Sequence, residues 1–442
     1  MPKKKVDNQW LILWYSNLNW SKKEAYLPEK DRFNHFYMIW QTWTGKSTMI
    51  LKQAISDIQK GHWVCVFDIY WDLSEKILQY YPKKRVDDLI YFDLWNTKYP
   101  IAFNPLDWAQ TDDEKDLLVN NLVDVFVDLY WPELFWPRIQ DYFRNACLLL
   151  MESRNGWTFM EVIRLISDKI FLESKTRNIK DPMVDYRRNK VYNQMWDREK
   201  QEILPFIQAK FSPFTTSRYL RYVIWQPNAQ PKTWFNFENF MQEKKVIICK
   251  FPKQVIWETN SNIMFRLILM KLRQAILKRV DIPKEERAPF FVYLDDFYQY
   301  APKNFWELLH EATKYNVWIT MSNQYLDQLK QWDKDISRTI LNNVWTILSF
   351  RVGDLDANCL ENYFSPEFSK NDLKSLETFK WIIKTSSNWI QWKPFIIDTD
   401  IELDKTLLNK KDKIDILKEI SVLRWWTKKE LVDKEIRFRI WV

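Results

Sequence analysis

Residues 36–48 read FYMIWQTWTGKST, and this stretch decides the fold that the sequence predicts. An apolar run at residues 36–39 leads through a short loop to TGKST at residues 44–48, after which apolar residues recur with helical spacing. A strand, a loop that ends in G-K-[ST] and a helix start are the parts of a P-loop, which binds nucleotide phosphates. We therefore predict a phosphate-binding loop at residues 40–48.

The residues of this loop have predicted roles in holding ATP and Mg²⁺. Lys46 would reach the β- and γ-phosphates, and the Ser47 hydroxyl would bind Mg²⁺. The backbone amides at the start of the helix would surround phosphate oxygens at its positive end. The predicted nucleotide-binding residues of the loop are Thr42, Thr44, Gly45, Lys46, Ser47 and Thr48.

Tryptophan occupies two positions that disturb this motif. Trp40 holds the position of the first glycine in the P-loop pattern, and Trp43 lies inside the loop. A non-glycine residue forced into a left-handed conformation costs about 1–3 kcal/mol, and two indoles would crowd a nucleotide. The whole chain contains 4 Gly and 26 Trp. Together these two residue types make up about 7% of the chain, which is the usual share of glycine alone.

We hypothesise that most of the tryptophans stand where the organism inserts glycine. This pattern results when UGA codons that the organism reads as glycine are translated as tryptophan. The alternative is a truly tryptophan-rich protein with a decayed nucleotide site. Six tryptophans fall at expected turns or loop edges, where the φ freedom of glycine is useful. They are Trp40, Trp43, Trp71, Trp136, Trp225 and Trp345.

Length, charge and cysteine content limit the class of protein. A chain of 442 residues has room for two or three domains, and no apolar run reaches the length of a membrane span. Four widely spaced cysteines without a C-x-x-C pair indicate reduced thiols in a cytosolic protein. The three histidines show no metal-ligand spacing. A net charge of +8 permits nucleic-acid binding without requiring it.

The order of predicted elements indicates an α/β core that is interrupted by helices. Short apolar runs alternate with helical segments up to residue 110 and again over 241–400, which is typical of a mainly parallel sheet. Residues 111–240 show long amphipathic segments and no convincing strand. We therefore predict a core in two parts (1–110 and 241–400), an all-helical insertion (111–240) and a helical basic tail (401–442).

Three segments carry specific expectations. Residues 10–15 are the single strand expected before the P-loop strand. Residues 158–172 form one amphipathic segment of the insertion, which we interpret as one helix. Residues 405–419 form the helix that leads into the basic tail.

Two carboxylates follow a second apolar strand. Residues 290–294 read FFVYL and are followed by Asp295 and Asp296, a pattern that fits a Walker B strand. Asp295 would hold Mg²⁺ through water, and Asp296 would polarise the attacking water. An apolar strand that ends in aspartate is common by itself, so the P-loop ahead of it gives the assignment its specificity.

Two further strand ends carry candidate polar groups. Gln324 follows the predicted strand 317–321, where a buried amide would sense the γ-phosphate and orient water. A simple polar strand end is the alternative for Gln324. Asp68 ends the strand beside the P-loop strand, at the edge where open α/β sheets bind ligands. A helix-capping role for Asp72 is equally consistent with this segment.

Basic and aromatic residues are interleaved in the helical insertion. Such interleaving suits phosphate contacts and base stacking, and a solvated helix face is the alternative. The basic residues are Arg177, Lys180, Arg187, Arg188, Lys190, Lys210, Arg218 and Arg221, and the aromatic residues are Tyr186, Tyr192, Phe211 and Tyr219.

Taken together, these residues resemble the FtsK/HerA-like motor ATPases, and most of all the type IV secretion coupling proteins with a conjugative-transfer ATPase domain. The resemblance spans roughly residues 10–397. Its main motifs are WQTWTGKST at 40–48, FNPL at 103–106, LDDFYQYA at 294–301 and SNQY at 322–325. The six tryptophans named above fall where such proteins carry glycine.

The resemblance implies a RecA-like P-loop NTPase core with an inserted all-α domain. It also implies a homo-hexamer that hydrolyses ATP with Mg²⁺ to move DNA, with conjugation or secretion proteins as possible partners. The implied location is the cytoplasm, or the inner face of the membrane through partners. The alternative is a catalytically inactive nucleic-acid-binding or scaffolding relative of the same fold.

Three departures from the family pattern are visible. Asp296 replaces the usual glutamate, which shortens the reach of the expected catalytic base. Thr313 and Lys314 stand where relatives often place an arginine finger, so Lys314, Arg338 or Arg351 would have to substitute for it. The N-terminal membrane helices of many coupling proteins are missing from this sequence.

Overall fold

Two units make up the chain, and each is described by itself. Unit 1 comprises Met1–Tyr91, Glu238–Phe251 and Ala275–Ile420, and unit 2 comprises Phe92–Phe237, Pro252–Gln274 and Ser421–Val442. The structure, a computed structural model, describes residues 10–18, 21–28, 32, 35–40, 46–70, 72–107, 109, 111–153, 157–176, 181–187, 189, 197–226, 235–302, 305–331, 334–387, 390–398, 408 and 410–441.

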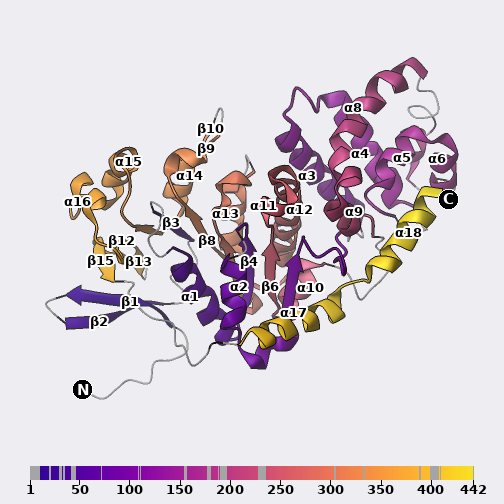
Figure 1. The fold of residues 1–442 in the computed structure, drawn as a ribbon. Helices are drawn as coiled ribbons and strands as arrows, with labels where there is room; N and C mark the ends of the chain where they lie inside the picture. The colour runs from indigo at the N-terminus through magenta and orange to yellow at the C-terminus, as the bar shows by residue number, and fades with distance from the viewer. Residues whose placement is uncertain are drawn as a thin grey trace. The chain divides into compact units, whose positions relative to one another are not determined.

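An 11-stranded sheet forms the core of unit 1, in the order β2-β1-β15-β12-β11-β3-β8-β7-β4-β6-β5 (Figure 1). The strands are β1 (Trp10–Leu18), β2 (Ser21–Pro28), β3 (Phe36–Ile39), β4 (Trp63–Asp68), β5 (Leu89–Asp93), β6 (Val246–Lys250), β7 (Phe290–Leu294), β8 (Val317–Asn323), β11 (Thr346–Ser349), β12 (Lys380–Lys384) and β15 (Phe395–Asp398). The pairs from β11 through β3, β8, β7 and β4 to β6 are parallel. Strands β12, β15, β1 and β2 continue the sheet in antiparallel pairs. The prediction of an α/β fold with a mainly parallel sheet is confirmed.

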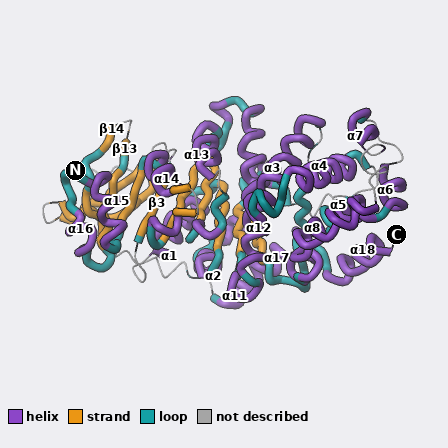
Figure 2. Tube along the Cα trace, turned by 90° about the horizontal axis from the view of Figure 1, so that it is seen from above, coloured by secondary structure: helices purple, strands orange, loops and turns teal. Residues whose placement is uncertain are grey.

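The central strands are continuous apolar runs because helices cover them on both faces. Every residue of β3, β4, β6, β7, β8 and β11 is buried, which is expected of parallel strands inside an α/β sheet. Figure 2 shows helices on both sides of these strands. The helices of unit 1 include α1 (Lys46–Gln59), α2 (Asp72–Gln79), α13 (Phe305–Lys314), α14 (Ile336–Asn343), α15 (Asp354–Phe364) and α16 (Lys370–Ser375).

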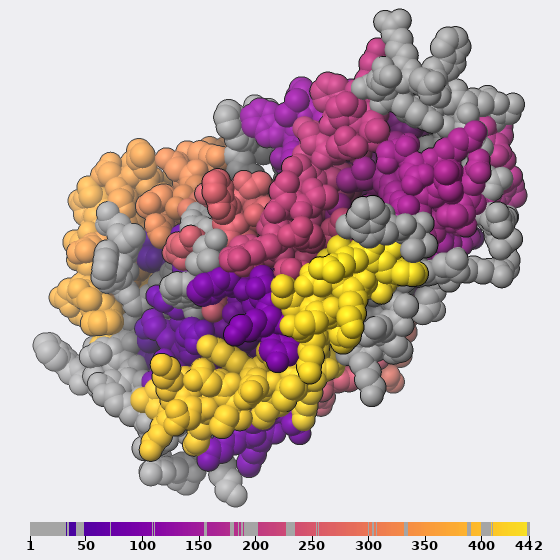
Figure 3. Space-filling view, turned by 45° about the vertical axis from the view of Figure 1, so that its right-hand side comes forward, coloured from indigo at the N-terminus to yellow at the C-terminus, as the bar shows by residue number. Residues whose placement is uncertain are grey.

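Helices α1, α2 and the first part of α17 (Lys411–Trp425) share one buried cluster with the sheet. Ile50, Ala54 and Ile58 of α1 lie in this cluster, as their helical spacing predicts. Figure 3 shows α17, in yellow, on the surface beside the purple residues of the N-terminal part. There the Lys418 amino group lies 2.8 Å from both carboxylate oxygens of Glu75 in α2.

Unit 2 is helical, and its centre is a group of phenylalanines. Its helices are α3 (Asp112–Tyr130), α4 (Pro137–Met151), α5 (Glu161–Ser167), α6 (Lys169–Thr176), α7 (Pro182–Arg187), α8 (Asp197–Thr216), α9 (Arg218–Ile224), α11 (Lys253–Ile256), most of α12 (Glu258–Leu277), and α18 (Lys429–Trp441). Phe126 lies within about 6 Å of the rings of Phe135, Phe143, Phe159 and Phe211. Among the described residues of 111–240 no strand occurs, which agrees with the helical insertion.

Two segment predictions were wrong in extent. The strand expected at residues 10–15 runs to Leu18 and pairs with β2, which was not predicted. The single helix expected over 158–172 is two helices, because Asp168 takes an extended backbone (φ −117°, ψ 105°) between them. Its carboxylate then accepts the N–H of Phe171 at 3.0 Å and begins the second helix.

The tail, which was predicted to be helical and basic, contains a second helix after α17. Helix α18 follows α17 and buries Val432 and Ile436, four residues apart, against Tyr222. Because most residues of this segment are charged, the sequence pattern did not reveal that Val432 and Ile436 attach it to unit 2. Among the described residues no helix combines the length and the hydropathy that a membrane span requires.

Candidate functional site

Four neighbouring parallel strands end together at the carboxyl edge of the unit 1 sheet. They are β3, β8, β7 and β4, in that order. Ile39, the last residue of β3, pairs with Asn323, and the Trp40 N–H donates to the Asn323 carbonyl at 3.4 Å. Because ligands of open α/β sheets bind outside the carboxyl ends of the strands, this edge is the place for a nucleotide site.

Asp295 follows β7 and is held from both sides. The Ser322 hydroxyl donates to Asp295 Oδ1 at 2.7 Å from the β8 side. The Asp295 N–H donates to the Phe67 carbonyl of β4 at 3.4 Å. The side chain is buried, so its position is set by the sheet. The expected metal-binding carboxylate therefore has a fixed place at this edge.

Asp296 lies in the left-handed region, with φ 48° and ψ 44°. Its N–H donates to Ser322 Oγ at 3.2 Å, so one hydroxyl contacts both carboxylate residues. Aspartate is among the few residues that enter this region readily, and such backbone conformations cluster at functional sites. Ser322 was not assigned by sequence reasoning, although its motif SNQY and its place at the end of a strand were visible.

Asp68 ends β4 and holds the loop that leads to α2. Its Oδ2 accepts the Ser74 N–H at 2.7 Å and the Ser74 hydroxyl at 2.6 Å, and its Oδ1 accepts the Tyr70 N–H at 3.0 Å. Burial raises the pKa of Asp68 to about 6, although the bonds from Ser74 oppose this rise and the charge of Asp295 adds to it. These bonds give Asp68 an anchoring role, while the Asp72 side chain is exposed. A ligand role for Asp68 stays a prediction.

A buried lysine lies beside Asp68 in the sheet. Lys250 of β6 pairs with Asp68, and its amino group lies 3.5 Å from Glu75 Oε1. Burial acts to raise the pKa of Glu75, but the bond from Lys418 and the charges of Lys418 and Lys250 lower it overall. Glu75 follows Ser74, so this charge cluster holds the same end of α2 that Asp68 holds.

The buried amide at the end of β8 belongs to Asn323 rather than to Gln324. Strand β8 extends to Asn323, two residues beyond the predicted end, and Asn323 is fully buried. Gln324 is half-buried, and its Oε1 accepts the Tyr325 hydroxyl at 3.2 Å. The expectation that Gln324 is a buried amide was wrong, because the strand is longer than its apolar run. Its role toward a nucleotide stays a prediction.

Most of the predicted P-loop lies outside the described residues. This applies to Thr42, Thr44 and Gly45. Helix α1 begins at Lys46, as predicted, but the side chains of Lys46 and Ser47 are not described, and Thr48 is exposed.

A buried ion pair positions the P-loop helix. Arg32, which precedes β3, donates to both oxygens of Asp57 in α1 at 2.7 and 2.8 Å. It also donates to the Tyr293 hydroxyl of β7 at 3.0 Å, and its guanidinium lies 4.2 Å from the ring centre of Phe291. These contacts join α1 to the strand that carries Asp295.

The interleaved residues of the insertion divide into two groups. Lys210 contacts the Tyr130 ring at 5.0 Å, and Phe211 is fully buried in the phenylalanine centre of unit 2, so a stacking role for Phe211 is wrong. Arg218 is exposed, and Tyr219 is half-buried. Arg177, Lys180, Arg188, Lys190 and Tyr192, with the side chain of Arg187, lie outside the described residues.

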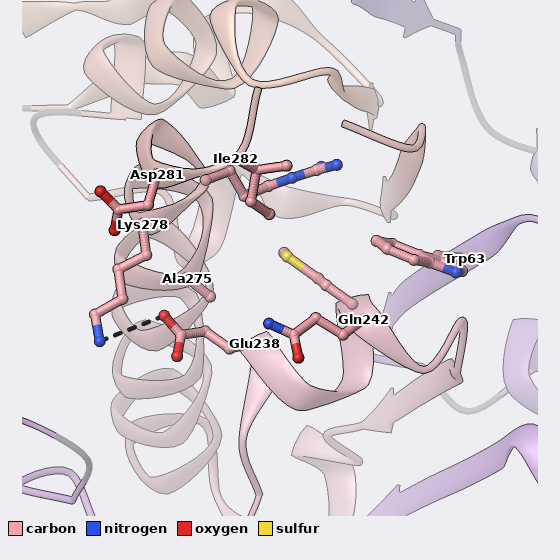
Figure 4. A pocket seen from close by; sticks show the side chains of 9 residues that line it. Trp63, Glu238, Gln242, Ala275, Lys278, Asp281 and Ile282 are labelled. Atoms are coloured by element: carbon pink, nitrogen blue, oxygen red, sulfur yellow. Dashed lines mark ion pairs between the residues drawn. The ribbon is translucent and has the colours of Figure 1, made fainter. Parts of the chain in front are cut away.

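A cavity of about 250 Å³ lies at the opposite, amino-terminal edge of the unit 1 sheet (Figure 4). Trp63, the first residue of β4, lines it together with Met241 and Ile282. The Lys278 amino group lies 3.5 Å from the Glu238 carboxylate at its rim. The cavity lies at the amino-terminal ends of the strands, whereas ligands of open α/β sheets bind at the carboxyl ends. It is therefore separate from the predicted nucleotide site.

The described residues hold no group of three or more His, Cys, Asp or Glu side chains arranged to bind a metal ion. Mg²⁺ at nucleotide sites usually keeps several waters and binds through one or two carboxylates plus phosphates. Asp295 would supply a carboxylate of that donor set, whereas the side chain of Ser47, the other predicted ligand, lies outside the described residues.

Comparison with solved structures identifies the fold. The bacterial conjugative coupling protein TrwB matches with a TM-score of 0.61 at 9% identity, over 90% of this chain and 91% of that one. The chain shares its fold with this protein. TrwB in complex with ADP and Mg²⁺ matches with a TM-score of 0.59 at 10% identity, over 88% of this chain and 89% of that one.

A second protein with the coupling-protein fold is VirB4 of Thermoanaerobacter pseudethanolicus. It matches with a TM-score of 0.57 at 12% identity, over 91% of this chain and 98% of that one. No protein-family model and no curated protein matches the sequence. The expected resemblance to FtsK/HerA-like motor ATPases is confirmed at the level of the fold.

The glycine hypothesis finds no support in these comparisons. The backbone φ angles of the described tryptophans differ, and only some of them are positive. The described members of the six are Trp40, Trp136, Trp225 and Trp345. None of these four has a positive φ, so the expectation that their backbones need glycine was wrong. Trp131 and Trp257, which were not among the six, have φ 69° and 73°.

Proposed function

We propose that the chain is an ATPase of the conjugative or type IV secretion coupling type, which hydrolyses ATP to move DNA. The observation that carries the proposal is the carboxylate edge. Asp295 is fixed by Ser322 beside the end of β3, the strand that leads into TGKST. A fold shared with TrwB, which has been solved with ADP and Mg²⁺, supports this assignment.

In this proposal Lys46 binds the β- and γ-phosphates, and Ser47 and Asp295 hold Mg²⁺. The ion would neutralise charge that develops on the phosphates. The backbone of Thr42, Thr44, Gly45 and Thr48 surrounds the phosphates. Asp296 orients the attacking water, Gln324 responds to the γ-phosphate, and Asp68 holds the loop before α2.

The proposal also sets the assembly and the partners. A homo-hexamer would place a cation of one subunit at the site of its neighbour. Arg351 is the described candidate at the carboxyl edge, because it is exposed just after β11, the strand next to β3. DNA is the proposed substrate to be moved, and secretion or conjugation proteins would hold the motor in the cytoplasm at the inner face of the membrane.

The test is ATP hydrolysis by matched variants. Lys46→Ala should abolish turnover and weaken nucleotide binding, whereas Lys76→Ala, at an exposed position of α2, should leave both unchanged. Asp295→Asn should weaken Mg²⁺-dependent binding, and Asp296→Asn should stop hydrolysis while binding is kept. Unchanged turnover in Lys46→Ala would refute the P-loop assignment.

The contribution of Ser322 to ATP hydrolysis can be measured separately from those of Lys46, Asp295 and Asp296. Ser322→Ala should reduce turnover about 10- to 100-fold, as the loss of a residue that orients a metal ligand usually does, and Ser322→Thr should restore part of it. A raised Mg²⁺ requirement in Ser322→Ala would identify the positioning role. Full activity with normal Mg²⁺ dependence would contradict it.

One observation favours a second candidate, a nucleic-acid-binding scaffold without turnover. Trp40 is buried at the position of the first P-loop glycine. If tryptophan is the true residue there, the chain as written should neither bind nor hydrolyse ATP. A variant with both Trp40→Gly and Trp43→Gly should gain nucleotide binding, and the absence of any gain would favour the scaffold.

A further inference from the structure

A cavity of about 630 Å³ lies in unit 2, between the junction of α8 with α9 and the start of α12. This volume falls inside the range of about 300–1,000 Å³ that is typical of ligand sites. The residues that matter for its chemistry are Thr216, Arg218, Tyr219, Trp257, Thr259 and Asn260.

Arg218 and Tyr219 form a flat, cationic surface in this cavity. The Arg218 guanidinium lies 4.8 Å from the Tyr219 ring centre, and its Nη2 donates to the Tyr219 hydroxyl at 2.8 Å. Arg218 is exposed, and within the described part of the chain no carboxylate pairs with it. An arginine that is not neutralised keeps its donors available for a phosphate, and a guanidinium held over a ring extends the surface on which a base can stack.

Neutral polar groups surround this pair. Thr216 and Thr259 are exposed, and the Thr216 hydroxyl donates to the Ser212 carbonyl at 2.8 Å. The Asn260 amide donates to the Ile256 carbonyl at 3.0 Å. Hydroxyls and amides are common partners of nucleic-acid phosphates and sugars. Glu258 is also exposed, and it lies in sequence between two lining residues, so its negative charge would weaken the binding of an anion.

We propose that this cavity binds single-stranded nucleic acid, with a phosphate on Arg218 and an unpaired base on the Arg218–Tyr219 pair. A duplex keeps its base faces stacked, so a ring inside a cavity is reached only by an unpaired base. The proposal does not depend on Trp257, whose backbone suits glycine. The proposal rests on the proposed DNA-moving function, because the bound single strand would be the DNA that the motor holds.

The test is fluorescence anisotropy of the full chain with a labelled oligothymidine strand and with a duplex of the same length. The measurement is made without ATP, so that it does not depend on hydrolysis. The single strand should bind tighter than the duplex. Tyr219→Ala should weaken single-strand binding about 5- to 150-fold, the usual effect of removing one stacking ring.

The variants distinguish charge from stacking. Arg218→Ala should weaken binding and lower the slope of log affinity against log salt by about 1, because one phosphate contact is lost. Glu258→Gln should tighten binding. The matched controls are Arg437→Ala and Phe438→Ala, two exposed positions of α18, which should bind as the wild type does.

Lys46→Ala should bind the strand normally even though its turnover is lost, which separates this proposal from the ATPase proposal. Equal affinity for strand and duplex, or unchanged binding in both Tyr219→Ala and Arg218→Ala, would overturn the assignment. Binding of neither nucleic acid would also overturn it.

Discussion

Two tryptophans have backbone angles that suit glycine. Trp131 has φ 69° and ψ 147°, and Trp257 has φ 73° and ψ 137°. Both side chains are exposed, at 50% and 80%, so neither ring is buried in a core. Such conformations cost about 1–3 kcal/mol in a residue with a side chain. Among the described tryptophans, the glycine hypothesis is therefore best tested at these two positions.

We expect Trp257→Gly to raise the free energy of unfolding by about 1 kcal/mol or more, because it relieves this strain. The matched control is Trp381→Gly, which removes a fully buried ring and should lower the free energy of unfolding by at least about 3 kcal/mol. Urea unfolding measures both. Mass spectrometry of the native protein should show glycine at Trp131 and Trp257. Destabilisation by Trp257→Gly would argue that tryptophan belongs there.

His35 makes unit 1 sensitive to acid. Its Nδ1 accepts the Ile319 N–H at 3.1 Å, so Nε2 carries the proton and donates to the Leu309 carbonyl at 2.6 Å. Burial lowers the pKa of His35 to about 4, although the bond to Leu309 opposes this. The unfolded chain therefore takes up a proton between about pH 6.5 and 4 that the folded chain does not.

The stability from His35 should be complete above about pH 6.5 and fall toward pH 4, by up to about 3 kcal/mol. Asp68 acts in the opposite direction, because its raised pKa makes the folded chain bind a proton between about pH 6 and 4. In urea unfolding from pH 7.5 to 4.5, His35→Asn should flatten the acid loss and Asp68→Asn should steepen it. Parallel pH curves for wild type and His35→Asn would contradict this.

At the scale of elements, the C-terminal helix α18 depends on buried charges. Arg439 Nη1 lies 3.1 Å from Glu161 Oε2 of α5, and the Arg439 carbonyl accepts Arg164 Nη1 at 2.6 Å. Glu161 also lies 3.3 Å from the Lys175 amino group. Because Glu161 and Arg439 are buried, removal of either one would leave charge without full compensation.

Arg439→Ala should therefore lower the free energy of unfolding by about 3 kcal/mol or more and expose α18 to hydrogen exchange and proteolysis. Lys434→Ala, at an exposed position of the same helix, is the control and should have little effect. If both variants were equally stable, the buried ion pair would not be what holds α18.

Elements with strong periodicity were predictable, and those set by single side chains were not. Helix α1 and strand β7 lie where their apolar patterns place them. The break at Asp168 depends on one side chain that caps the next helix, which the apolar pattern does not reveal. The anchoring of α18 depends on Glu161, which lies far away in the sequence. The sequence therefore predicted a helical basic tail but not the residue that holds it.

At the scale of the whole molecule, the sequence indicates that the two carboxylates follow a strand, but it does not reveal the residues that hold them. Asp295 and Asp296 follow the strand predicted for them, since an apolar run ending in two acids is a local signal. Ser322 and Asn323 reach the same edge only through the pairing of β8 with β7 and β3. Phe211 looked like a stacking residue because burial in unit 2 is not visible in the sequence.

If the proposed hexamer forms, its subunits should complete one another's sites. Arg351→Ala and Lys46→Ala should each lack DNA-stimulated ATPase activity alone. In an equal mixture, about a quarter of sites would combine an intact Lys46 with a neighbour's Arg351, so activity should return. The comparison is Arg338→Ala, whose side chain is exposed in α14. If the mixture recovered no ATPase activity, or if Arg338→Ala alone lost activity, Arg351 would not be the arginine that acts on the neighbouring site.

The turn after β7 restricts which acid can occupy position 296. Aspartate enters the left-handed region several times more readily than most residues, and glutamate has no such preference. A single exchange to the glutamate that is usual in the motor ATPases that the sequence resembles would lengthen the carboxylate but strain the turn and its bond to Ser322. The short acid therefore suits this turn, and a chain with glutamate at position 296 would carry the strain of the left-handed backbone together with a longer side chain.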